Sequence, residues 1–291
     1  MTKAHAGSTV SQWCGRLGYS KQAWYKRNKS FSKHDSRDAA ILQSIQTVRH
    51  LLPFCGMRKV HYLSKTNETG QSLKAGRDAF FRVARSNGLL IKARKRYYKT
   101  TDSKHWQRQY EDLIKDLDIC VPDQVWVADI TYLGGRSELY LHLVTDAYSK
   151  KIMGWHLAED LSATSTVHAL EMAVTQRVYI GPLIHHSDRG LQYLSKAYAQ
   201  SLGRAGICSS STQNGSPYEN PVAERINGIL KQEFGLERKW PDIDSAKIEV
   251  KQAVHLYNHM RPHYSNCYLT PEQMHGQQIQ KIRTYRLPVS P

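Results

Sequence analysis

From residue 124 onward, short runs of β-branched and aromatic residues alternate with segments of helical periodicity, and this alternation is what most limits the possible folds. Gln124 opens the first run (QVWVADITYL), and a Gly134-Gly135 turn separates it from the next. The strands expected from such runs cover residues 124–133, 138–145, 151–157, 182–187 and 207–211. Short links make the first three an antiparallel set, so the pattern predicts a mixed α/β domain.

Four helices are expected between and after these strands. Ser162 or Thr164 caps the first, whose apolar residues recur at helical spacing. The other three are expected at residues 195–202, from about Val222, and at 243–257. A loop rich in Asn, Gly, Ser and Pro covers residues 212–221 and leads into the helix at Val222. The helix at Val222 places Glu224, Gly228 and Lys231 on one face, because they are four and then three positions apart.

Charge divides the chain into two unlike parts. Residues 1–120 hold 24 basic and 9 acidic side chains, a net of +15, whereas residues 121–291 hold 17 and 16, a net of +1. A strongly basic part joined to a nearly neutral one is typical of a nucleic-acid-binding region attached to a different kind of domain.

The basic part is expected to be helical. Residues 8–17 and 20–27, with Gly18 between them, have helix-turn-helix proportions, and a second set of helices is expected at 38–52, 57–65 and 76–87. Residues 91–101 form a basic linker. The side chains expected to contact DNA are Trp24, Lys26, Arg27, Arg58, Lys59, Arg94, Lys95 and Arg96.

Composition indicates the setting in which the chain works. The five cysteines are scattered without a CxxC pair, which argues for reduced thiols in a cytosol. The first ten residues lack an apolar segment of the kind found in a secretory signal, and no apolar run is long enough for a membrane span. We therefore expect a cytoplasmic protein without a membrane partner.

Three carboxylates occupy positions that can converge at one edge of the sheet. Asp129 lies within the first strand, Asp188 at the end of the fourth, and Glu224 on the following helix, with 58 and 35 residues between them. Such a set repels itself unless a cation joins it, and hard oxygen ligands suit Mg²⁺. Aspartates at strand ends are also common caps and turn residues, so the spacing alone leaves both interpretations open.

Five ordered sequence blocks resolve that choice by resemblance. They are VWVADITYL from Val125, DAYSKKIMGW from Asp146, HHSDRGLQY from His185, STQNGSPYENPVAERINGILKQE from Ser211 and YNHMRPHYSNCYLTP from Tyr257. Together they resemble the IS3-family insertion-sequence transposases of bacteria over residues 120–275, and residues 8–100 look like the helix-turn-helix region of that family. The resemblance implies an RNase H-like catalytic core of the retroviral-integrase type, a mixed sheet flanked by helices.

The resemblance also implies a division into domains. It predicts a DNA-binding region at 1–100, a linker at 101–120, the catalytic core at 121–240, and a helix and tail completing the core at 241–291.

Roles for individual residues follow from the same resemblance. It places the family's metal-binding catalytic triad on Asp129, Asp188 and Glu224, and the basic residue that contacts DNA on Lys231. Tyr218 and Asn220 of the preceding loop are expected to contact DNA as well. Glu219 stands where the family often has Asp, but it precedes the helix and is a poorer candidate for the third carboxylate. Asn227 stands where the family often has an aromatic residue, and we expect consequences for packing only.

The activity implied is Mg²⁺-dependent cleavage at the 3′ ends of an insertion sequence followed by strand transfer, with Mn²⁺ tolerated. The expected partners are double-stranded DNA, further copies of the chain on that DNA, and an upstream-frame protein or a frameshift fusion with it. A nucleoid-associated bacterial protein is expected. Two alternatives remain: a catalytically inactive DNA-binding protein, and a nuclease of the same fold that does not join strands.

Overall fold

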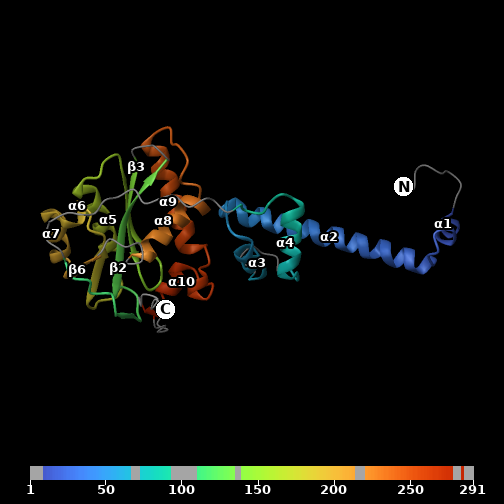
Figure 1. Ribbon diagram of the computed structural model, residues 1–291, viewed down its shortest axis with the longest axis horizontal. Helices are drawn as coiled ribbons and strands as arrows, with labels where there is room; N and C mark the ends of the chain where they lie inside the picture. Colours follow the sequence, from blue (N-terminus) through green and yellow to red (C-terminus); the bar gives the residue numbers. More distant parts are fainter. Residues whose placement is uncertain are drawn as a thin grey trace. The chain divides into compact units, whose positions relative to one another are not determined.

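The computed structural model describes residues 9–66, 73–92, 110–134, 139–213, 220–277 and 283–284, and it divides the chain into two compact units. The first comprises residues 1–50 and 56–92, and the second comprises residues 51–55 and 93–291. Figure 1 shows the helical unit in blue and cyan and the sheet-containing unit in green to red. Within the described part of the chain, no helix combines the length and apolar character needed to cross a membrane.

The first unit is helical, as its sequence predicts. Its elements are α1 (Val10–Arg16), α2 (Lys21–Leu51), α3 (Met57–Lys65) and α4 (Arg77–Ser86). Thr9 and Gln12 form a reciprocal capping box that starts α1. The core of this unit consists of apolar side chains from the second half of α2 and from α3 and α4, namely Ile41, Ile45, Val48, Val60, Phe80 and Val83.

The prediction of two separate helices at 20–27 and 38–52 is wrong, because α2 runs unbroken through 31 residues. No Gly or Pro lies between Lys21 and Leu51, so nothing in the sequence ends the helix at the polar stretch that separates the two predicted segments. Arg82 of α4 holds this helix by two hydrogen bonds of 2.7 Å to the carboxylate of Asp38.

The second unit contains a five-stranded mixed sheet with the order β4-β3-β2-β5-β6. Its strands are β2 (Val125–Leu133), β3 (Leu139–Asp146), β4 (Ile152–Ala158), β5 (Leu183–Ser187) and β6 (Ile207–Ser211). Strands β2, β3 and β4 are antiparallel as predicted, and β5 and β6 continue the sheet in parallel with β2. A separate two-stranded pairing joins β1 (Asp118–Ile119) to β7 (Arg283–Thr284).

Helices cover both faces of this sheet (Figure 1). They are α5 (Ala163–Thr175), α6 (Leu191–Leu194), α7 (Lys196–Arg204), α8 (Pro221–Glu233), α9 (Ile243–His259) and α10 (Pro271–His275), and a 3₁₀ turn spans Tyr264–Asn266. Of the two predicted caps for α5, Ser162 is the N-cap and Thr164 lies inside the helix, whereas α6 and α10 are too short to show a periodicity in the sequence.

Alternation along β2 decides which side chains face which helices. Trp126 and Ala128 pack with apolar residues of α5 and α7, whereas Val125 and Val127 pack with Ala223 of α8 and Met274 of α10. Asp129 has the parity of Val125 and Val127, so the strand directs it toward the side that α8 covers.

Close packing of α5 on β4 depends on a glycine. A Cβ atom at Gly154 would lie 2.1 Å from the carbonyl oxygen of Ala169 and 2.7 Å from the backbone nitrogen of Ala173. No side chain fits there, which explains the glycine in the middle of a strand.

Candidate active site

Strand register places Asp129 and Asp188 next to each other at one edge of the parallel pair. Ala128 of β2 pairs with Ser187, the last residue of β5, and each aspartate comes one residue later. The parallel pairing ends there because β5 ends at Ser187, whereas β2 continues beside β3 to Leu133, and ligand sites in such sheets lie beyond the carboxyl ends of parallel strands. Both side chains remain partly exposed to solvent.

The start of α8 brings Glu224 to the same edge. Asn220 donates a hydrogen bond of 2.9 Å from Nδ2 to the carbonyl oxygen of Ala128, which ties the beginning of the helix to the residue before Asp129. Pro221 then occupies the first turn, where its missing N–H costs nothing. Glu224 follows in that turn with an exposed side chain.

The three carboxylates are close enough to perturb one another. Burial, together with the charges of Asp188 and Glu224, raises the pKa of Asp129 to about 7. Burial also raises the pKa of Asp188. A site that disfavours its own ionised carboxylates is one in which a cation would be stabilising.

Hydrogen bonds fix the orientation of both aspartates. Asp129 Oδ1 accepts from the backbone nitrogen of Ile130 at 2.9 Å, and its Oδ2 accepts from Nδ2 of Asn227 at 2.6 Å. Asp188 Oδ1 accepts from the backbone nitrogen of Gly190 at 3.0 Å.

Asn227 is a site residue that the sequence did not reveal, and the expectation that it affects packing only is wrong. It lies on α8 three residues after Glu224 and four before Lys231, so all three share a helix face. Its side chain is buried, and its Oδ1 has no hydrogen-bond partner among the described residues. The pattern Glu-x-x-Asn-x-x-x-Lys could have indicated this face.

Lys231 lies half-buried near the carboxylates. Burial lowers the pKa of Lys231, and the charges of Glu237 and Asp129 partly oppose that effect. The lysine is therefore placed on the acidic side of α8, within electrostatic reach of Asp129.

The remaining residues expected to bind DNA are spread over both units. Lys26, Arg27 and Arg58 are exposed, whereas Trp24 and Lys59 are half-buried. Arg94, Lys95, Arg96, Tyr218 and the rival carboxylate Glu219 lie outside the described residues. Asn220 is buried and uses its amide nitrogen to anchor α8.

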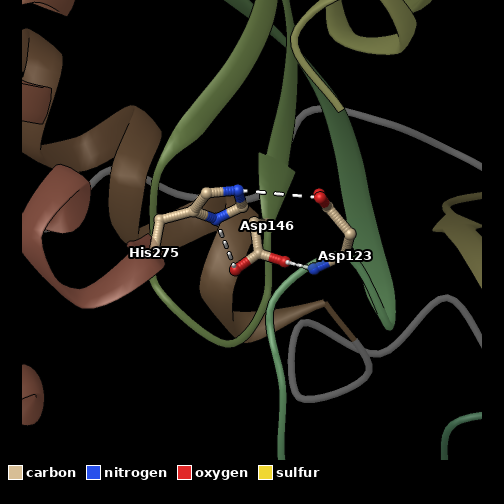
Figure 2. Close-up of side chains that lie close together, drawn as sticks. All are labelled: Asp123, Asp146 and His275. Atoms are coloured by element: carbon tan, nitrogen blue, oxygen red, sulfur yellow. Dashed lines mark hydrogen bonds and ion pairs between the residues drawn. The ribbon is translucent and has the colours of Figure 1, made fainter. Parts of the chain in front are cut away.

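A second acidic cluster, which the sequence did not indicate, lies at the other end of β2. Asp123, Asp146 and His275 are all buried and, among the described residues, are the set of His, Cys, Asp and Glu whose ligand atoms all lie within 4.8 Å of one another. Figure 2 shows the imidazole between the two carboxylates. His275 Nε2 lies 3.7 Å from Asp123 Oδ2, and Nδ1 lies 3.7 Å from Asp146 Oδ2.

Protein donors already occupy every carboxylate oxygen of this second cluster. Asp123 accepts from Trp126 Nε1 and from the backbone nitrogens of Val178 and Tyr179. Asp146 accepts from the backbone nitrogen of Asp123 and from the nitrogen and hydroxyl of Ser149. Because the two imidazole nitrogens also face different carboxylates, the arrangement is that of a structural hydrogen-bonded cluster rather than of ligands around one metal ion.

Comparison with known proteins defines the class of this core. Two family profiles described as integrase core domain match residues 121–217 and 205–271. The sheet with helices on both faces is the RNase H-like fold of that domain. The catalytic core of HTLV-2 integrase in complex with magnesium is a structural neighbour with a TM-score of 0.43 and 21% identity, covering 53% of this chain and 97% of that one.

Relatives of similar length identify the family. A protein assigned as the transposase for insertion sequence element IS986/IS6110 of Mycobacterium tuberculosis is 32% identical over 244 residues, covering 80% of this chain and 86% of the relative. Transposase InsF of insertion sequence IS3fB from Escherichia coli is 30% identical, covering 67% and 69%. The IS629 transposase of Shigella sonnei is 36% identical, covering 48% and 47%. The chain belongs to the insertion-sequence transposases, and it acts on DNA as a transposase.

Proposed function

We propose that Asp129, Asp188 and Glu224 together bind divalent cations, Mg²⁺ in the first place, and that this site cleaves the 3′ ends of the element and joins them to target DNA. The observation that carries the proposal is the register of β2 and β5, which places Asp129 and Asp188 one residue beyond a paired position. Glu224 is held to the same edge through the bond from Asn220 to Ala128.

The donor set fits such a cation. All three side chains offer oxygen atoms, which Mg²⁺ prefers over nitrogen or sulfur. Burial and the neighbouring carboxylates raise the pKa of Asp129 to about 7, so a cation at this site would compensate charge that the folded protein disfavours. When bound, the cations would lower the pKa of an attacking water or 3′-hydroxyl and stabilise the leaving oxygen of an in-line phosphoryl transfer.

The protein's own groups divide the remaining work. Asp129 and Asp188 supply the fixed ligands because strand geometry holds their backbone. Glu224 stands on the exposed first turn of α8 and orients the attacking oxygen. Lys231 shares its helix face and binds a phosphate next to the scissile bond without touching the cation.

Recognition of DNA is assigned to the basic N-terminal unit. The net charge of +15 over residues 1–120 against +1 over the remainder supports this division. Exposed Lys26, Arg27 and Arg58 would bind phosphates, which makes affinity fall steeply with salt. We further propose that copies of the chain assemble on the two element ends, either alone or with the upstream-frame product.

A cleavage-and-joining assay tests the triad. The full chain is incubated with labelled terminal-repeat DNA and Mg²⁺ at one fixed salt concentration, and DNA binding is measured in parallel. Asp129→Asn is nearly isosteric and should abolish cleavage and joining together while binding of the ends is retained, because charge compensation is most of the catalysis. Lys231→Ala should reduce the rate only partly.

Glu219→Gln serves as the matched control, because it removes the rival carboxylate. It should remain substantially active, whereas Glu224→Gln should be inactive. An active Asp129→Asn variant, or the reverse result for the two glutamates, would refute the assignment. Cleaved but unjoined products from the wild-type chain would identify a nuclease of the same fold, and DNA binding without either product would identify an inactive DNA-binding protein.

A further inference from the structure

Tyr193 lies beside Asp188, and its hydroxyl has no hydrogen-bond partner among the described residues. It belongs to α6, the short helix that begins three residues after Asp188, and its backbone nitrogen donates to the carbonyl oxygen of Gly190 at 3.0 Å. A Cβ atom at Gly190 would lie 3.0 Å from Asp188 Oδ1 and 3.4 Å from Cδ2 of Tyr193. The carboxylate and the edge of the ring therefore border the same point.

The hydroxyl of Tyr193 is buried without a hydrogen-bond partner. The side chain is 4% exposed, and among the described residues no donor or acceptor pairs with its oxygen. Leaving a buried hydroxyl unpaired is costly, because the group has lost its bonds to water, so such a group usually has a partner.

The neighbouring Tyr198 packs in the same cluster, but its hydroxyl has a hydrogen-bond partner. Tyr198 contacts Tyr193 edge-on at 5.4 Å between ring centroids, and both pack against His185. The Tyr198 hydroxyl bonds to His185 Nε2 at 2.8 Å. The two tyrosines share one apolar cluster, yet only the one beside the acidic site lacks a partner.

The surroundings keep the Tyr193 hydroxyl protonated. Burial raises the pKa of Tyr193 well above its usual range, and the charges of Asp188 and Asp129 raise it further. The hydroxyl therefore keeps its proton at neutral pH and is available as a hydrogen-bond donor.

We propose that the Tyr193 hydroxyl donates a hydrogen bond to an oxygen ligand of the cation held by Asp129 and Asp188. That oxygen belongs either to a water of the cation's hydration shell or to a phosphate of the bound DNA. The inference rests on the proposed function, since it assumes a cation at the two aspartates. Tyr193 would thereby orient those ligands of the cation that the carboxylates do not supply.

Tyr193→Phe tests this by removing one oxygen atom and nothing else. Magnesium chloride is titrated calorimetrically into the full chain without DNA, and the Mg²⁺ dependence of the cleavage rate is then measured with terminal-repeat DNA. Without cation, the variant should be at least as stable as the wild type, because it loses only an unpaired polar atom. Its Mg²⁺ affinity should fall about tenfold, the effect of one lost hydrogen bond to a charged group.

Tyr198→Phe is the matched control in the same cluster. It breaks the bond to His185 and should lower the melting temperature, but it should leave Mg²⁺ affinity unchanged. A purely structural role for Tyr193 predicts that Tyr193→Phe, like Tyr198→Phe, leaves the Mg²⁺ affinity unchanged.

The titration without DNA and the cleavage assay with DNA together distinguish the source of the oxygen. A weaker affinity without DNA assigns it to water, and a change seen only in the Mg²⁺ dependence of cleavage assigns it to phosphate. Wild-type behaviour of Tyr193→Phe in both arms would overturn the inference, provided that Asp129→Asn abolishes Mg²⁺ binding in the same titration. If Asp129→Asn binds Mg²⁺ like the wild type, the proposed function itself fails.

Discussion

Two acidic clusters lie along β2, six residues apart, and they treat their carboxylates in opposite ways. Around Asp123 and Asp146, backbone and side-chain donors bond every carboxylate oxygen, and His275 lies between the two acids. Around Asp129 and Asp188, the described residues donate to three of the four carboxylate oxygens, and burial together with the like charges raises the pKa of Asp129.

The difference teaches how a structural acid can be told from one that awaits a ligand. Residue type, burial and closeness of the oxygens would select the first cluster, because its ligand atoms are the more tightly grouped. Incomplete hydrogen bonding of the carboxylate oxygens selects the second cluster instead. Where protein donors already complete the hydrogen bonding, a cation has little to add, whereas partly unsatisfied and mutually repelling carboxylates gain most from one.

Asp146→Asn should have the largest effect on stability. The change places an amide nitrogen or oxygen where the two donors of Ser149 converge on Asp146 Oδ2, so it breaks a buried polar network. We expect the free energy of unfolding to fall by about 3–5 kcal/mol, measured by urea unfolding at neutral pH. Asp116→Asn, an exposed aspartate of the same unit, should change it by less than about 0.5 kcal/mol. Equal effects of the two changes would mean that the cluster is not structural.

Asp129→Asn should have the opposite effect and raise the free energy of unfolding when a chelator removes divalent cations. Folding raises the pKa of Asp129 to about 7, so the ionised form is disfavoured in the folded state. The resulting penalty is absent below the unfolded value near pH 4, grows as the pH rises, and is complete above pH 7. The variant should therefore unfold with a free energy about 2 kcal/mol larger than the wild type at pH 8, a value that allows for the partial solvent exposure of the site.

Thermal or urea unfolding at pH 8 and pH 4 with EDTA measures this gain, which should vanish at the lower pH. Excess Mg²⁺ should reverse the order by stabilising only the wild type. A destabilised Asp129→Asn variant at pH 8 without cation would show that this acid is structural, like Asp146.

The sequence predicted on which elements the candidate site residues lie. Patterns of residues put Asp129 within a strand, Asp188 at a strand end and Glu224 on the helix after a polar loop, whereas only the resemblance to a family selected them as a triad. The strands and most helices of the second unit followed from the same patterns, and the cap of α5 was narrowed to two residues, of which Ser162 is the one used.

What the sequence did not predict depends on contacts between distant segments. His275 reaches Ser149 across 126 positions, and nothing local distinguishes it from the other histidines. Asn227 required the register of α8 against β2, which only the packed structure supplies. The unbroken α2 was missed because a polar stretch was interpreted as a boundary, although a helix ends for lack of hydrogen bonding or capping rather than of apolar residues.

Asn227→Leu sharpens the comparison most finely, because Asn227 supplies the side-chain hydrogen bond that Asp129 receives from the protein. The bond is 2.6 Å long and fixes Oδ2, while the asparagine's own Oδ1 is buried and unpaired among the described residues. Leucine has a similar volume and cannot donate, so the fold should persist with a change in unfolding free energy within about 1.5 kcal/mol. The carboxylate would lose its fixed orientation, and cleavage should slow by about tenfold with binding of the DNA ends unchanged.

Gly228→Ala, one residue along the same helix, provides the control, since an added Cβ there meets nothing within 4 Å and should leave the cleavage rate at the wild-type level. If Asn227→Leu cleaved as fast as Gly228→Ala, Asp129 would need no donor to hold it, and the contrast between the clusters would be complete: one acid fixed entirely by the protein, the other by its ligand.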